Sequence, residues 1–172
     1  MPLEEQGARL LQALDGLDEE LTRFARAFVA TPSPNPPGDE RAASLCVQEE
    51  LERQGVADLR VLAGEPHRPN LVVDIGPDSG RTLVLAGHLD TKPAGDLDAW
   101  ERDPWDPAMV DGELWGLGSA DMKCAVAGML FAGIALATWG LAWLVLGLIG
   151  ETVVRVDQHT TLLHHFFQMP IA

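Results

Sequence analysis

The chain has little positive charge, and this shortage bears on the kind of partner it can have. Its 172 residues include 12 Lys and Arg against 26 Asp and Glu, which gives a formal net charge of −14. A protein that binds DNA or RNA needs a positively charged face, so a nucleic-acid partner is disfavoured. Most of the acidic side chains keep the surface hydrated, although individual carboxylates can also be metal ligands.

The chain also has little cysteine and no recognisable secretory leader. Its two cysteines, Cys46 and Cys124, lie far apart and form no CxxC pair, so no disulfide framework is indicated. The first twenty residues are acidic and lack the basic and apolar regions of a signal peptide. We therefore expect a cytoplasmic protein with one domain, since 172 residues can bury a core of ordinary size.

One long segment has no charge at all. From Cys124 to Gly150 there is no charged residue, and a run of that length could span a bilayer. The alternative is a buried helix from Met122 to about Thr138, followed by a buried strand over 144–149. Glycines within the run make a break plausible, and Trp139-Gly140 is the expected position.

The pattern before this run predicts two helices separated by a proline-rich break. Apolar residues recur at steps of three or four and form one stripe of a first helix: Leu10, Leu14, Leu17, Leu21, Phe24 and Phe28. Four prolines between Thr31 and Gly38 end that helix. A second helix is predicted from an N-cap at Asp39 to about Gln54, with Gly55 as its stop.

Short strands are predicted after the second helix. Segments 59–62, 70–75 and 82–86 are leucine-rich or β-branched and are bounded by Gly, Pro and Asp. The turn residues Asp78-Ser79-Gly80 predict a hairpin between the last two of these strands. A second hairpin is predicted over 110–114, with Asp111-Gly112 at its tip.

The first group of residues with candidate chemistry follows the predicted strand 82–86. His88 and Asp90 are two positions apart in Gly-His-Leu-Asp, so they point to the same side of an extended backbone. A metal-bound imidazole usually donates its other N–H to a carboxylate. The pair therefore fits a metal ligand, His88, with its orienting carboxylate, Asp90, although a hydrogen-bonded histidine at a strand end is the simpler alternative.

The second group is the sequence Trp-Gly-Leu-Gly-Ser-Ala-Asp-Met-Lys, residues 115–123. It is similar to a glycine-rich phosphate loop, but Asp121 stands at the third glycine position and would repel a pyrophosphate. A carboxylate on a glycine-rich loop before a helix suits a metal cation. The alternative is that Asp121 only caps the helix. Lys123 is predicted to be a solvated residue of the first helical turn.

Taken together, these motifs resemble a known family. The order Gly-His-Leu-Asp-Thr-Lys-Pro, a Trp, Asp-Pro-Trp and Asp-Gly-Glu-Leu-Trp-Gly-Leu-Gly-Ser-Ala-Asp-Met-Lys resembles the zinc metallopeptidases that include acetylornithine deacetylase, succinyl-diaminopimelate desuccinylase, the aminoacylases and carboxypeptidase G. The resemblance covers about residues 31–137. It implies an α/β fold, a partial zinc-peptidase-like catalytic domain with a mixed β-sheet flanked by helices.

The resemblance also implies a site. His88 matches a histidine ligand of one metal ion, Asp90 matches the carboxylate that supports it, and Asp121 matches the aspartate that bridges two ions. The implied cofactors are two divalent ions, most often zinc, with cobalt as an alternative. The implied activity is hydrolysis of amide bonds in N-acyl amino acids or small peptides.

Part of the family pattern has no counterpart in the later sequence. The family has a Glu-Glu pair after the next strand, of which the first is the general base, and further acidic and histidine ligands. Here a single glutamate, Glu151, stands near the expected position as a weak candidate. Residues 153–172 do not resemble the family, so no role is carried to their ligand-type residues: Asp157, His159, His164 and His165.

These departures lead to expectations about the whole chain. We expect residues 1–172 to be an incomplete catalytic domain without the inserted domain that mediates dimerisation in the family. A frameshift or truncation near Thr138 would explain the abrupt loss of resemblance, and the chain is then weakly active or inactive. Two alternatives stay open: a non-catalytic remnant or binding module, and a protein anchored in a membrane through 124–150.

Overall fold

The centre of the fold is a mixed sheet of four strands. The computed structural model describes residues 7–8, 11–12, 14–56, 58–75, 82–138 and 151–156. The strands are β1 (Leu59–Leu62), β2 (Asn70–Ile75), β3 (Thr82–Gly87) and β6 (Glu151–Val156), in the order β1-β2-β6-β3. β6 is antiparallel to β2 and parallel to β3. The predicted mixed sheet and its first three strands are therefore confirmed, with β3 ending at Gly87, one residue later than predicted.

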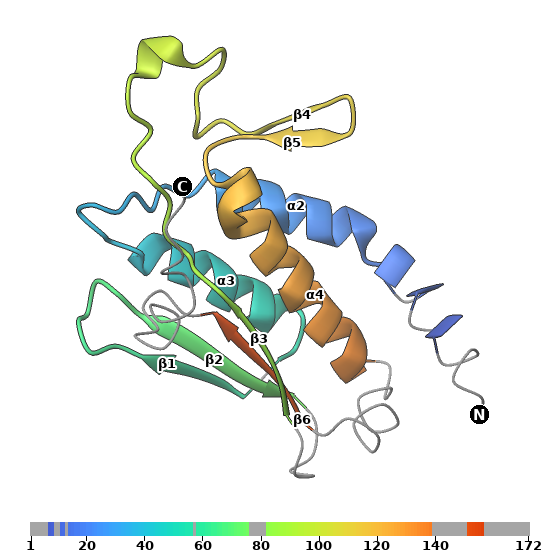
Figure 1. The fold of residues 1–172 in the computed structure, drawn as a ribbon. Helices are drawn as coiled ribbons and strands as arrows, with labels where there is room; N and C mark the ends of the chain where they lie inside the picture. Colours follow the sequence, from blue (N-terminus) through green and yellow to red (C-terminus); the bar gives the residue numbers. More distant parts are fainter. Residues whose placement is uncertain are drawn as a thin grey trace, which may run out of the picture.

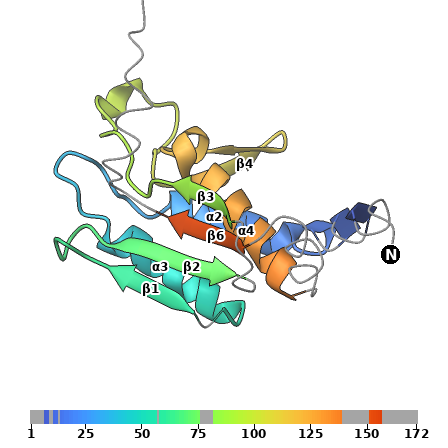
Figure 2. The ribbon, with the colours of Figure 1, turned by 60° about the horizontal axis from the view of Figure 1, so that its bottom comes forward.

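The predicted hairpin between the second and third strands is wrong. β2 and β3 do run in opposite directions, but they are not neighbours, because β6 lies between them and pairs with both (Figure 2). The turn residues 78–80 and the predicted strand 144–149 lie outside the described residues. A local turn signal cannot show that a strand from more than 60 residues further along the chain enters the sheet.

Three helices lie on one side of this sheet: α2 (Asp18–Val29), α3 (Arg41–Arg53) and α4 (Cys124–Thr138) (Figures 1 and 2). In α2, Phe24 and Phe28 are buried, as the apolar stripe predicts, and their rings stack at 5.5 Å between centroids. Phe131 of α4 lies 6.0 Å from Phe24. Acidic residues in the first turn of α2 and Arg26 in its last turn complement the helix dipole.

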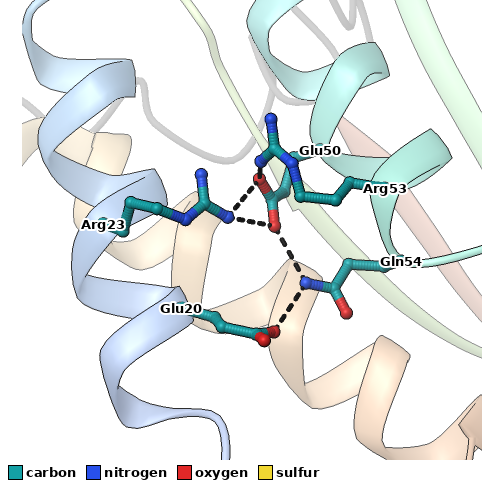
Figure 3. A network of polar contacts seen from close by, with 5 residues as sticks. All are labelled: Glu20, Arg23, Glu50, Arg53 and Gln54. Carbon is teal, nitrogen blue, oxygen red and sulfur yellow. Dashed lines mark hydrogen bonds and ion pairs between the residues drawn. The ribbon is translucent and has the colours of Figure 1, made fainter.

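The second predicted helix is confirmed, with Gly55 directly beyond its C-cap at a φ of +74°. Its N-cap is Glu40, without a side-chain cap hydrogen bond, and not Asp39 as predicted. A polar network ties this helix, α3, to α2 (Figure 3). The buried Glu50 carboxylate accepts two hydrogen bonds from Arg23 at 2.9 and 2.8 Å, and others from Arg53 and Gln54. A buried carboxylate is tolerated only with such partners, so this network fixes how α2 packs on α3.

The helix α4 supplies most of the apolar contact with the sheet. Its buried residues Val126, Leu130, Phe131 and Ile134 join the core formed by α2, α3 and β2. One stretch among the described residues, Ser119–Leu136, is long and apolar enough to cross a membrane by length and composition, and 44% of it is buried. The buried part of this stretch packs inside the domain, as predicted for a buried helix. Residues 139–150, the rest of the uncharged run, lie outside the described part.

A small hairpin and a glycine-rich loop lead into α4. The strands β4 (Ala108–Val110) and β5 (Glu113–Trp115) pair in antiparallel fashion around Asp111 and Gly112, which confirms the predicted hairpin. The turn η2 (Ser119–Lys123) then connects to α4 and carries Asp121. Both cysteines, Cys46 and Cys124, are free, as the sequence predicts.

Candidate metal centre

The strand β3 positions the first candidate ligand. It ends at Gly87, whose backbone packs so closely on α4 that a Cβ atom there would lie 2.6 Å from Val126 Cγ2. Only glycine fits this contact without a shift of its neighbour. The next residue, His88, therefore leaves the end of the strand at a defined place beside the start of α4.

Asp90 holds one nitrogen of His88, as the alternation along the strand predicts. His88 Nδ1 lies 3.0 Å from Asp90 Oδ1 and 2.9 Å from the Asp90 backbone oxygen. The hydrogen bond with the Asp90 carboxylate is the largest of the effects that raise the pKa of His88 to about 9. The imidazole is thus oriented by Asp90, and its second nitrogen, Nε2, points away from this contact.

The turn η2 brings Asp121 to that second nitrogen. Asp121 Oδ1 lies 3.0 Å from His88 Nε2, although the two residues are 33 positions apart in the chain. Gly118 precedes the turn at a φ of +87°, and Asp121 has an extended backbone (φ −136°, ψ 93°) within it. The Asp121 side chain is 82% exposed, so its carboxylate is held at the surface by the turn rather than by burial.

A residue that the sequence reasoning missed supports Asp90 from behind. Asn35, within the proline-rich segment, donates its side-chain amide to Asp90 Oδ2 at 2.8 Å. Burial by itself would raise the pKa of Asp90, but the hydrogen bonds from His88 and Asn35 outweigh it and lower the pKa. The sequence predicts a helix break and a family likeness for this segment, but no signal in it points to a contact with Asp90.

The predicted environment of Lys123 near the site is wrong. It is not solvated but almost fully buried, and its Nζ donates to the backbone oxygens of Phe28, at 3.0 Å, and Thr31. The ammonium also lies 5.0 Å from the centroid of the Phe28 ring. Lys123 therefore ties the turn that carries Asp121 to the C-terminal end of α2 and to the start of the proline-rich segment.

The burial of Lys123 predicts an unusual dependence of stability on pH. Burial lowers the pKa of Lys123 from 10.5 to about 8. Between these values the unfolded chain binds more protons than the folded one, so stability rises with pH across this window. The change corresponds to about 3 kcal/mol. Urea unfolding at pH 7.5 and pH 10.5 should show a larger rise in the free energy of unfolding for the native protein than for Lys123→Met. An equal change in the free energy of unfolding in both proteins would contradict this prediction.

The geometry of His88 and Asp121 can be tested against the needs of a metal ion. Zinc bonds of about 2.0–2.1 Å place two tetrahedral ligand atoms roughly 3.3 Å apart. The observed 3.0 Å between His88 Nε2 and Asp121 Oδ1 is close to that separation. The pair therefore fits two ligands of one ion. Within the described residues no group of three His, Cys, Asp or Glu side chains is assembled. His88 and Asp121 would therefore supply only some of the ligands that an ion needs.

The structure does not bring Glu151 to this pair. Glu151 is the first residue of β6, and its backbone pairs with that of Thr82 at the start of β3. Because β6 is parallel to β3, that position is roughly 20 Å along the strand from His88. Residues 157–172, with the other ligand types noted in the sequence, lie outside the described part. A surface groove of about 660 Å³ lies elsewhere, between α2 and the loop at Pro107.

Comparison with known sequences places this geometry in a family. Residues 84–143 match the model of peptidase family M20/M25/M40, and this segment contains both His88 and Asp121. The chain carries an M20-family segment. Enzymes of this family generally use divalent metal ions, which agrees with the chemistry of the pair.

Individual relatives show the same likeness in sequence. The chain is 41% identical over 116 residues to a succinyl-diaminopimelate desuccinylase of Methylobacterium radiotolerans, which is 66% of this chain and 29% of the relative. It is 36% identical over 121 residues to the desuccinylase of Methylorubrum extorquens, 69% of this chain and 31% of that protein. The chain thus spans about three tenths of the length of these M20 relatives.

Solved structures show the same fold. Human carnosine dipeptidase 1 superposes with a TM-score of 0.64 at 23% identity, over 88% of this chain and 34% of the dipeptidase. An M20 family metallo-carboxypeptidase of Sulfolobus solfataricus gives a TM-score of 0.64 at 19% identity, over 81% of this chain and 30% of the enzyme. The α/β architecture expected from the sequence, a mixed β-sheet flanked by helices as in part of a zinc-peptidase-like domain, is confirmed by these likenesses in fold.

Proposed function

We propose that this chain contributes His88 and Asp121 to a centre of two divalent metal ions that hydrolyses amide bonds. The observation that carries the proposal is the 3.0 Å contact between His88 Nε2 and Asp121 Oδ1, made by two loops far apart in the sequence. Asp90 acts as the positioning carboxylate, because it binds the other nitrogen of the same ring. Zinc is the ion we favour, since imidazole and carboxylate ligands suit it.

His88, Asp90 and Asp121 each have a definite task in this proposal. Asp90 holds the Nδ1–H of His88, which leaves the Nε2 lone pair free for an ion once the ring is neutral. Asp121 offers two oxygens from an exposed position and can therefore bridge two ions. When bound, such ions lower the pKa of a shared water and polarise the scissile carbonyl.

The substrate class follows from the relatives rather than from a pocket. The sequence relatives described above are desuccinylases, which by name remove a succinyl group. We therefore propose an N-acyl amino acid as the substrate, with small peptides as the alternative. We propose no role for Glu151, because β6 places its backbone at the far end of β3. We also propose that the protein acts in the cytoplasm.

Zinc stoichiometry of the purified chain tests this function and separates it from a non-catalytic binding module. A stoichiometry near two zinc ions per chain, removable by a chelator and dependent on His88, supports the enzyme. A value near zero supports the binding module. We expect slow hydrolysis of N-succinyl or N-acetyl amino acids by the chain alone, because the described residues include no third ligand. Robust zinc-dependent hydrolysis unaffected by His88→Ala would overturn the proposed site.

A further inference from the structure

The proline-rich segment runs alongside the site and is joined to it by several contacts. Pro34 and Thr91 form a parallel bridge, with Asn35 N donating to Thr91 O at 2.8 Å and Thr91 N donating to Ser33 O at 2.9 Å. Ser33 Oγ also donates to the Leu89 oxygen at 2.6 Å. These bonds fix the register between residues 33–35 and residues 89–91, on either side of Asp90.

This register delivers the Asn35 side chain to Asp90. The two oxygens of Asp90 are divided between two partners: Oδ1 lies 3.0 Å from His88 Nδ1, and Oδ2 accepts from Asn35 at 2.8 Å. A carboxylate held at both oxygens cannot rotate about its last bond without losing a hydrogen bond. Asn35 therefore determines the direction in which Asp90 presents its other oxygen to the ring.

The opposite side of the Asn35 amide is also closely packed. Gly38 turns the chain back at a φ of +81°, and its N donates to Pro34 O at 3.0 Å. A Cβ atom on Gly38 would lie 3.2 Å from Asn35 Oδ1 and 3.4 Å from both Glu40 Oε1 and Arg68 Cζ. Glu40 is buried, with Arg68 Nε 3.7 Å from its Oε2. The turn at Gly38 therefore lies close to the oxygen of the Asn35 amide, and the Glu40–Arg68 pair lies close to the same turn.

We propose that Asn35 is a positioning residue of the His88 site, which acts through Asp90 to hold the imidazole with Nε2 facing Asp121. The proposal rests on the proposed metal-dependent function for its purpose, but the contact itself can be tested without a metal. Asn35 touches neither an ion nor a substrate in this role. It makes the first of three successive contacts, which run from Asn35 to Asp90, from Asp90 to His88 and from His88 to Asp121.

Exchange of the His88 Nδ1 hydrogen provides the test without metal. In ¹⁵N-histidine NMR of the metal-free chain, the native protein should show a resolved Nδ1–H that exchanges slowly with water. Asn35→Asp keeps the shape but removes the donor, and should speed this exchange at least about tenfold. Asn35→Ala serves as a second variant that places no new charge beside Asp90. Unchanged exchange in both folded variants, or no protected Nδ1–H in the native chain, would overturn the proposal.

Ser33→Ala is the matched control for a structural role. It removes a buried hydrogen bond from the same bridge but leaves the Asn35–Asp90 contact in place. It should lower stability and leave the Nδ1–H exchange within about twofold of the native value, whereas an equal effect in Ser33→Ala would reduce Asn35 to a structural part of the loop. Competition for zinc with a chromophoric chelator adds a second readout, with about tenfold weaker binding expected for Asn35→Asp. Absence of zinc binding in the native chain would contradict the proposed function alone.

Discussion

Asp121→Asn is expected to weaken zinc binding by at least about 100-fold while leaving the stability of the fold almost unchanged. A neutral amide oxygen is a poor ligand for zinc and cannot bridge two ions, and loss of even a supporting partner typically costs 10–100-fold in affinity. The Asp121 side chain is 82% exposed, so its replacement should change the free energy of unfolding by no more than about 0.5 kcal/mol.

Two measurements separate these effects. Isothermal titration with zinc gives the affinity, and urea unfolding of the metal-free protein gives the stability. Asp111→Asn is the matched control, because it removes the same charge at the tip of the β4–β5 hairpin, where the backbone φ of 52° suits asparagine. This control should bind zinc as the native chain does. Native affinity in Asp121→Asn would show that the contact with His88 does not serve a metal.

Gly118→Ala should strongly destabilise the loop that carries Asp121. Gly118 has a φ of +87°, a conformation that costs other residues about 1–2 kcal/mol. An added Cβ would in addition lie 2.5 Å from Thr91 Cγ2, next to Asp90, and overpacking of this kind typically costs 1–3 kcal/mol. We therefore expect a loss of about 2–5 kcal/mol in the free energy of unfolding.

The glycine after α3 isolates the backbone contribution. Gly55 has a similar φ of +74°, but nothing lies within 4 Å of the position a Cβ would take. Gly55→Ala should therefore cost only the conformational part, about 1–2 kcal/mol. The difference between the two losses in free energy of unfolding, measured in urea, gives the cost of the contact between the added Cβ at position 118 and Thr91. Equal losses in the two variants would show that the loop adjusts freely.

Much of the local structure could be predicted from the sequence because it depends on neighbouring residues. The apolar stripe through Phe24 and Phe28 and the Asp111-Gly112 turn each encode their own geometry within a few positions. The relation of His88 to Asp90 is of the same kind, since a two-residue spacing on extended backbone places both side chains together. The contact of His88 with Asp121 needed the resemblance to a family, because nothing local links residues 33 positions apart.

The errors share a physical cause, which is contact over long distances in the sequence. β6 enters the sheet between β2 and β3, which defeats the hairpin that a turn signal favoured. Lys123 is buried because its Nζ reaches backbone oxygens 92 and 95 residues earlier in the chain, where charge alone suggests solvent. Asn35 meets Asp90 across 55 residues, and no periodicity or motif reports such a contact.

The exposed fraction of the side chain increases from Asp90, the proposed positioning residue, through His88 to Asp121, the outer proposed ligand. The Asp90 side chain is 19% exposed, His88 34% and Asp121 82%. The inner groups are already locked before any ion arrives, while the outermost carboxylate meets bulk water. Loading should then require no refolding and should proceed at a rate set by dehydration of the incoming cation, and a chelator in solution should strip the ion just as readily.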